Sequence, residues 1–122
     1  MDHHVDEFPF NGFLPPVANP PAVNRAHAGQ TVPIRFGLGG DRGLGVIAPG
    51  YPTAQHVDCT TGAPLDPPTP TSSPGHVRLR YDDSSGVYTY LWKTDRAYAL
   101  TCQVFTLGLV DGSTHTALFR FG

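Results

Sequence analysis

The residues best suited to binding or chemistry are concentrated in one short stretch, YTYLWKTDRAYALTC at positions 88–102. This stretch holds the chain's only tryptophan, its only lysine and one of its two cysteines. A row of exposed aromatic rings can stack on sugars, whereas rings that point inward fill the core of a small β-domain. We favour the core for the tryptophan, because one indole contributes much of the buried area of a small sandwich. The candidate ligand-binding aromatics are Tyr88, Tyr90, Trp92 and Tyr98.

Lys93 suggests a second chemistry, an internal amide bond to an Asn or Asp side chain on another strand. Such a bond needs a desolvated amine beside a carboxylic acid. Lys93 is the only candidate amine apart from the N-terminus. The simpler interpretation, which we favour, is an exposed lysine that pairs with Asp95 across a turn.

Asp82 and Asp83 are weak candidates for calcium binding. They lie in the sequence YDDSSG, whose oxygens suit Ca²⁺, but the bidentate Glu of an EF-hand loop is missing. Asp and Ser also cap the backbone amides of ordinary turns. The histidines show no metal-ligand spacing, although His56 and Asp58 would share one face of a strand. We therefore predict no metal and no other cofactor.

Catalysis has little support in the sequence. There is no G-x-S-x-G motif, and every serine lies in a turn or loop cluster. The acidic residues also lie mainly in turns, which leaves Asp58 as the only one in an expected strand. No pair of carboxylates is therefore placed for glycoside hydrolysis. We predict that the protein is not an enzyme.

The elements that must position these residues are β-strands. The chain has 122 residues, the size of one domain. It contains 14 glycines and 13 prolines, and only 15% of its residues are charged, against about a quarter in an average domain. Lys, Glu and Met, which favour helices, occur once each, whereas Thr, Val, Tyr and Phe are plentiful. The composition predicts an all-β domain.

The charge and hydropathy argue against two kinds of partner. A formal net charge of −2 and a pI of about 6.3 give no basic field for phosphates, so we predict no nucleic-acid binding. No stretch reaches the ~18 apolar residues of a spanning helix, so we predict no membrane insertion. The N-terminus, MDHHVDEFPF, is acidic where a secretory signal is basic and apolar. We expect either a cytoplasmic chain or a mature fragment that begins with an added Met.

The N-terminal part is expected to contain edge elements and one regular strand. Residues 1–9 are assigned to a flexible segment or one added for expression, and 10–122 to the domain. Proline pairs make 8–30 an edge strand or an extended lead-in. Residues 31–40 alternate as a half-buried strand, with Pro33 at an edge or beside a bulge. The inward side chains of this strand are Val32, Ile34, Phe36 and Leu38.

The middle of the chain is expected to be mostly turn and loop. Residues 39–53 are rich in glycine and are predicted to form turns. A short strand follows within 54–61, with Val57 and Cys59 on a common face. Residues 62–75 contain five prolines and are too stiff and polar to build a core, so they are predicted to form a surface loop.

Two hairpins are predicted in the C-terminal half. The first joins alternating strands at 76–81 and 87–94 through a turn at 82–86, and places Tyr88, Tyr90 and Trp92 on one face. The second has Asp111–Gly112 as a two-residue loop, because Gly tolerates the positive φ of hairpin turns. Cys102 has the opposite parity to the inward residues and would need a bulge to point inward. Those inward residues are Phe105, Leu107, Leu109, Ala117, Phe119 and Phe121.

Together these elements describe an immunoglobulin-like two-sheet antiparallel β-sandwich of about seven strands. The order cysteine, tryptophan, cysteine fits this fold, although in antibody domains the tryptophan lies closer to the first cysteine. A disulfide between Cys59 and Cys102 would tie the two layers together and contribute about 4 kcal/mol in the chain-entropy model. Two buried free thiols in a cytosolic protein are the alternative.

Most of the chain, residues 10–121, resembles the PxKF domain, a module named for a Pro-x-Lys-Phe tetrapeptide and found in secreted bacterial proteins. The resemblance is carried by the tetrapeptide at 33–36, the WKTD run at 92–95, the spaced cysteines and the DGSTHTALFRF hairpin. The chain departs from the family at Arg35, where the family usually has lysine. Arginine keeps the charge but excludes a lysine-specific covalent role at this position.

The resemblance implies an immunoglobulin-like module appended to extracellular enzymes and surface proteins, with no known catalytic residues. It also implies an oxidising compartment, a Cys59–Cys102 disulfide and a secreted or cell-surface location. We therefore expect a non-catalytic spacer, stabiliser or adhesion unit. Its partners would be neighbouring domains of a larger polypeptide or other protein subunits, with polysaccharide as a further candidate. The alternatives are a carbohydrate- or cell-wall-binding module with exposed aromatics, and a structural subunit such as a virion decoration or sheath protein.

Overall fold

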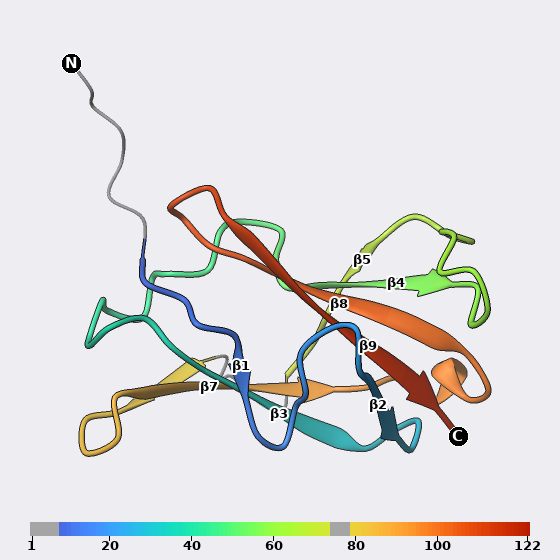
Figure 1. Cartoon of the computed structure of the whole chain (residues 1–122), viewed down its shortest axis with the longest axis horizontal. Helices are drawn as coiled ribbons and strands as arrows, with labels where there is room; N and C mark the ends of the chain where they lie inside the picture. Colours follow the sequence, from blue (N-terminus) through green and yellow to red (C-terminus); the bar gives the residue numbers. More distant parts are fainter. Residues whose placement is uncertain (1–7, 74–78) are drawn as a thin grey trace.

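Two stacked β-sheets make up the computed structural model, which describes residues 8–73 and 79–122 (Figure 1). The first sheet has the strand order β1 (Phe13–Leu14), β3 (Thr31–Gly37), β7 (Val87–Lys93), β6 (Leu79–Asp82). The second sheet has the order β2 (Val23–Ala26), β9 (Thr114–Phe121), β8 (Cys102–Gly108), β4 (Thr53–Val57), β5 (Thr69–Pro70). One short 3₁₀ helix, η1 (Arg96–Tyr98), lies between β7 and β8. The predicted all-β sandwich is confirmed.

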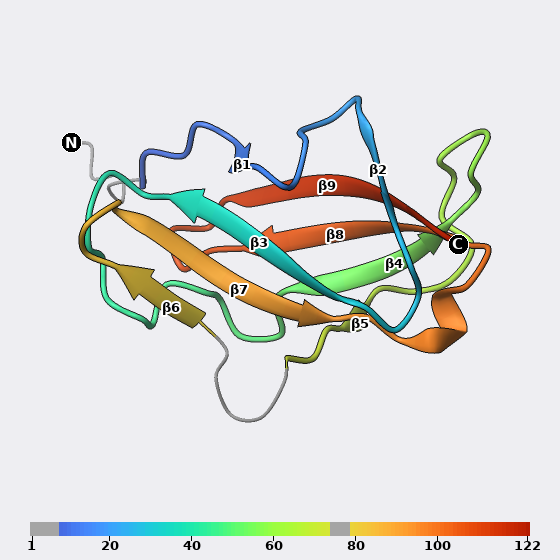
Figure 2. The same cartoon turned by 90° about the horizontal axis from the view of Figure 1, so that it is seen from below.

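The strand order follows that of an immunoglobulin domain, with A, B, E and D in one sheet and G, F and C in the other (Figure 2). The described residues form nine strands, whereas about seven were predicted. The N-terminal segment is divided between the sheets, because prolines between β1 and β2 lack the N–H that continued pairing needs. β2 runs parallel to β9, which makes this edge an exception to the predicted antiparallel pairing. The proline-rich loop adds β5, which pairs with β4.

The inner face of the first sheet matches the alternation predicted from the sequence. Pro33 lies in an edge portion of β3, because β1 pairs only with Arg35 and Phe36. The predicted positions 76–78 of the next strand lie outside the described residues. The side chains that β3 and β7 bury on this face are Val32, Ile34, Phe36, Tyr88, Tyr90 and Trp92.

Trp92 fills the space between the two sheets. Its side chain is 0% exposed, and its ring centroid lies 4.9 Å from that of Phe105 and 5.1 Å from that of Phe119, both on the second sheet. The indole Nε1 is buried and has no hydrogen-bond partner among the described residues. An unpaired buried donor costs about 1–3 kcal/mol, which is less than the burial of so large a ring contributes together with its packing.

The Cys59–Cys102 disulfide is present, with Cα atoms 5.3 Å apart, but it does not tie the two layers together. β4 and β8 are neighbours in one sheet, and Val57 at the end of β4 pairs directly with Cys102. Cys59 lies in the turn after β4 rather than in the strand. The register of β8 with β9 is continuous, so no bulge turns Cys102 inward and it stays on the opposite face from Phe105. The predicted inter-layer link is therefore wrong, and the bond fastens two adjacent strands on the outside of one sheet.

The β8–β9 hairpin has a three-residue loop, one residue longer than predicted. The Leu109 N–H donates to the Ser113 carbonyl, and the Gly112 N–H donates to the Leu109 carbonyl. Gly112 has φ +91°, which glycine adopts without strain. A type I turn closed by a left-handed glycine gives this loop length. The predicted inward positions of both strands are buried: Phe105, Leu107, Leu109, Ala117, Phe119 and Phe121.

The fold begins before residue 10. The Phe8 N–H donates to a carboxylate oxygen of Asp111 at 2.9 Å, and the Phe8 side chain packs against the core. Phe10 stacks on His115 with ring centroids 3.7 Å apart. Phe8 and Pro9 therefore belong to the domain, while 1–7 lie outside the described residues.

Candidate functional site

Three of the four candidate aromatics do not form an exposed platform. Tyr88, Tyr90 and Trp92 are 0%, 1% and 0% exposed, so none of them presents a ring face to a ligand. The hydroxyl of Tyr88 accepts from the Arg42 N–H at 2.6 Å and donates to the Gly43 carbonyl at 2.8 Å. The row acts as core, the interpretation that the sequence analysis favoured for Trp92, and as an anchor for the 41–43 loop.

Tyr98, the fourth candidate, is placed differently. It lies in η1, which begins where the Asp95 carboxylate accepts the Ala97 N–H at 2.9 Å. Its ring packs against Trp92 and Phe121, with centroids 6.1 Å and 5.3 Å away, yet the residue is only half-buried. Burial, with the charge of Asp95 adding to it, raises the pKa of Tyr98, so its hydroxyl stays protonated at neutral pH.

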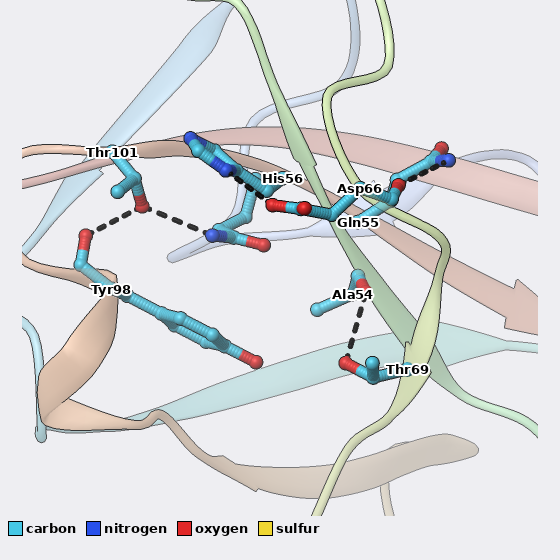
Figure 3. A network of polar contacts seen from close by, with 8 residues as sticks. Ala54, Gln55, His56, Asp66, Thr69, Tyr98 and Thr101 are labelled. Carbon is cyan, nitrogen blue, oxygen red and sulfur yellow. Dashed lines mark hydrogen bonds and ion pairs between the residues drawn. The ribbon is translucent and has the colours of Figure 1, made fainter.

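A cleft of about 500 Å³, with a mainly apolar lining, opens beside Tyr98, between η1 and the inner sides of β4 and β8 (Figure 3). In Figure 3 the Tyr98 ring reaches from η1 toward Ala54 and Thr69, and His56 and Asp66 lie above them in the view. The cleft is lined by Ala54, His56, Asp66, Pro67, Thr69, Ala97, Tyr98, Thr101 and Gln103.

The ionisable side chains of this cleft include a histidine–aspartate pair. His56 Nδ1 lies 2.7 Å from Asp66 Oδ2. Two further bonds hold the loop in place: Gln55 Nε2 donates to the Asp66 carbonyl at 3.0 Å, and the Leu65 N–H donates to the His56 carbonyl at 2.9 Å. Among the described residues Asp66 Oδ1 has no partner, so one carboxylate oxygen is available to a ligand.

The sequence suggested that His56 and Asp58 share one face of a strand. In the structure His56 contacts Asp66 instead. The Asp58 carboxylate caps its own turn, where it accepts the N–H groups of Thr60 and Thr61 at 2.8 Å and 2.9 Å. The bonds from Thr61 and then Thr60 lower the pKa of Asp58. Asp66 was overlooked because it lies in the proline-rich loop, and no local spacing indicates that β5 brings this loop back onto β4.

Gln103 supplies the buried polar group of the cleft. It is 5% exposed and shares the inward parity of Phe105 on β8. Its Nε2 donates to Thr101 Oγ1 at 3.0 Å, and that hydroxyl donates to the Tyr98 carbonyl at 2.6 Å. The signal that could have identified Gln103 is an amide at an inward position of an otherwise apolar alternation.

The polar side chains of the cleft differ in what is left to contact a ligand. Both threonine hydroxyls of the cleft donate to backbone carbonyls, Thr69 to Ala54 and Thr101 to Tyr98, so neither is oriented toward His56. The described residues contain no group of three or more His, Cys, Asp or Glu side chains placed for a metal ion. What remains is one tyrosine ring, one carboxylate and one amide facing a shared space.

The remaining sequence candidates lie away from this cleft. The Asp82 carboxylate accepts from the Ser84 hydroxyl and N–H and from the Ser85 hydroxyl, and the Ser84 side chain contributes most to lowering the pKa of Asp82. Both of its oxygens therefore cap the turn, and Asp83 is exposed beside it. Lys93 is exposed, and no bond between Lys93 and Asp95 is seen in the part of the chain that the structure describes.

Comparisons with known proteins found no relative, so the class of this protein is defined by its fold. No family model matches the chain, and neither the curated proteins nor the solved structures include one that is similar to it. The described part contains no helix with the length and hydropathy needed to cross a bilayer. The fold and the disulfide define the class: a disulfide-bonded β-sandwich with the strand order of an immunoglobulin domain.

Proposed function

We propose that the protein is a non-catalytic immunoglobulin-like module of an extracellular or cell-surface bacterial protein, where it serves as a spacer, stabiliser or adhesion unit. The observation that carries the proposal is the Cys59–Cys102 disulfide, because such bonds persist in oxidising compartments. The resemblance to the PxKF domain supports the same setting. The burial of Tyr88, Tyr90 and Trp92 withdraws these three rings from the alternative based on exposed aromatics, which leaves only Tyr98 for it.

The path of the chain suits a spacer. Phe8 is bonded to Asp111 in the β8–β9 loop, and β9 runs from this loop along the length of the sandwich to the marked C-terminus (Figures 1 and 2). The described chain therefore enters at one end of the long axis and leaves at the other. A rigid sandwich connected in this way would hold two neighbours at a fixed separation.

The spacer role can be tested by placing the chain between two globular reporter proteins. Small-angle X-ray scattering should give one fixed separation between the reporters, close to that expected for an intact sandwich. A matched fusion with a Gly/Ser linker of the same number of residues provides the comparison, because such linkers behave as flexible coils. A separation as broadly distributed as that of the linker control would overturn the proposal.

A further inference from the structure

We propose that the cleft beside Tyr98 binds a neutral sugar ring. This role goes beyond that of a spacer, which requires no cleft. It rests on one ring face, one carboxylate oxygen and one buried amide that meet in a space of about 500 Å³. That volume lies within the usual range for small-ligand sites, roughly 300–1,000 Å³.

The Tyr98 ring is fixed before any ligand arrives. Trp92 and Phe121 pack against it, and the Asp95 cap holds the 3₁₀ turn that carries it. The Tyr98 hydroxyl has no hydrogen-bond partner among the described residues. A ring that is immobilised by the core and still half-exposed loses little entropy when the apolar face of a sugar packs on it.

The polar atoms of the cleft suit hydroxyl groups, which both donate and accept. Asp66 Oδ1 and Gln103 Oε1 are acceptors with no partner in the described part of the chain, and the Tyr98 hydroxyl can act in either role. Each acceptor is held in place, Asp66 by His56 and Gln103 by Thr101. Orientation by such fixed polar groups is how small-ligand sites achieve specificity.

The charge of the lining favours a neutral ligand over an anionic one. Among the described residues no lysine or arginine lines the cleft, and the one basic side chain there, His56, already faces Asp66, whose carboxylate would repel phosphate, sulfate or uronate groups. A quaternary ammonium group is the competing ligand, because it could sit over the Tyr98 ring. Such a cation has no N–H or O–H donors, so it would leave the acceptors of Asp66 and Gln103 without hydrogen bonds.

The test is a titration of the ¹⁵N-labelled full chain, followed by NMR. The probes are neutral trisaccharides of glucose, mannose, galactose and N-acetylglucosamine, with tetramethylammonium as a separate arm. At least one sugar should give saturable shifts at the amides of Asp66, Ala97 and Gln103. Asp66→Ala should weaken binding about tenfold or more through loss of a charged acceptor. The matched control Asp83→Ala removes an exposed aspartate far from the cleft and should leave the affinity unchanged.

A second variant, Ala97→Trp, adds a large side chain at an exposed position of the lining and should abolish binding while the unfolding temperature stays the same. Three results would overturn the proposal: no saturable shifts with any sugar, shifts located elsewhere, or binding that survives both variants. Preference for tetramethylammonium over every sugar would also overturn it. The separation of reporters in the spacer experiment is measured independently, so failure of one proposal does not imply failure of the other.

Discussion

The row of aromatics on β7 and the single tyrosine of η1 differ in what surrounds them, although both come from the same short stretch of sequence. Tyr88, Tyr90 and Trp92 alternate into the space between two sheets and are fully buried. Tyr98 follows the end of β7, where the chain turns, and its side chain is only half-buried.

This difference shows that residue type alone does not decide between a core and a binding surface. The hydroxyl of Tyr88 is used twice, to accept from Arg42 and to donate to Gly43, and so it fixes a loop. The hydroxyl of Tyr98 has no partner among the described residues and faces a cleft. Two identical side chains in one segment therefore have different surroundings, and substitution of each hydroxyl can measure the difference.

Removing the Trp92 ring should have the largest effect. Trp92→Ala is expected to lower the free energy of unfolding by about 3–5 kcal/mol, because it leaves a cavity between the sheets. Urea titration followed by circular dichroism measures this loss. Leu100→Ala, at a position that is 87% exposed, is the control and should change stability by less than about 0.5 kcal/mol. Equal losses in the two variants would contradict the assignment of Trp92 to the core.

Removing the disulfide should have the next largest effect. The Cys59→Ala/Cys102→Ala double variant is expected to lose about 2–4 kcal/mol, because the bond closes a loop spanning 43 residues. The bond lies on the outer face of its sheet, so the tryptophan fluorescence of the folded double variant should match that of the parent. A large shift of the native emission maximum would place the bond inside the core and contradict its observed position.

Removing the hydroxyl of Tyr88 should have an intermediate effect. Tyr88→Phe keeps the ring but leaves the Arg42 N–H and the Gly43 carbonyl without their partner. We expect a loss of about 1–2 kcal/mol. The amide of Arg42 should also exchange faster with deuterium. Unchanged stability together with unchanged exchange would show that the hydroxyl does not anchor this loop.

Alkaline pH should lower the stability of the fold through ionisation of the Tyr88 hydroxyl. Burial raises the pKa of Tyr88 in the folded state above its ordinary value near 10. A raised pKa stabilises the fold below the unfolded value, and this stability is lost as the pH rises through the folded value. The free energy of unfolding should therefore decline above about pH 10, and less so in Tyr88→Phe than in the parent. Parallel pH curves for the two proteins would contradict this.

Removing the hydroxyl of Tyr98 should have the smallest effect on stability. Tyr98→Phe deletes an oxygen that has no partner among the described residues, so we expect a change of less than about 0.5 kcal/mol. The variant should still weaken sugar binding in the titration described above. A loss as large as that of Tyr88→Phe would remove the distinction between the two tyrosines.

Much of the fold could be predicted because alternation is a local signal. The inward residues of β3, β7, β8 and β9 follow directly from period-two patterns. The disulfide was also predicted, but its place was not, because strand order is not encoded in the spacing of Cys59 and Cys102. The cleft was largely missed, since Asp66 meets His56 only after β5 folds back onto β4.

The sequence by itself determined the class of the domain and the composition of its core, because side-chain alternation, glycine turns and proline breaks act within a few residues. The tertiary structure decided which sheet each strand joins, which face carries the disulfide and which tyrosine remains accessible. These outcomes depend on contacts between residues far apart in the chain, such as Gln103 on β8 beside Tyr98 on η1. Only the packed molecule brings such groups into one space.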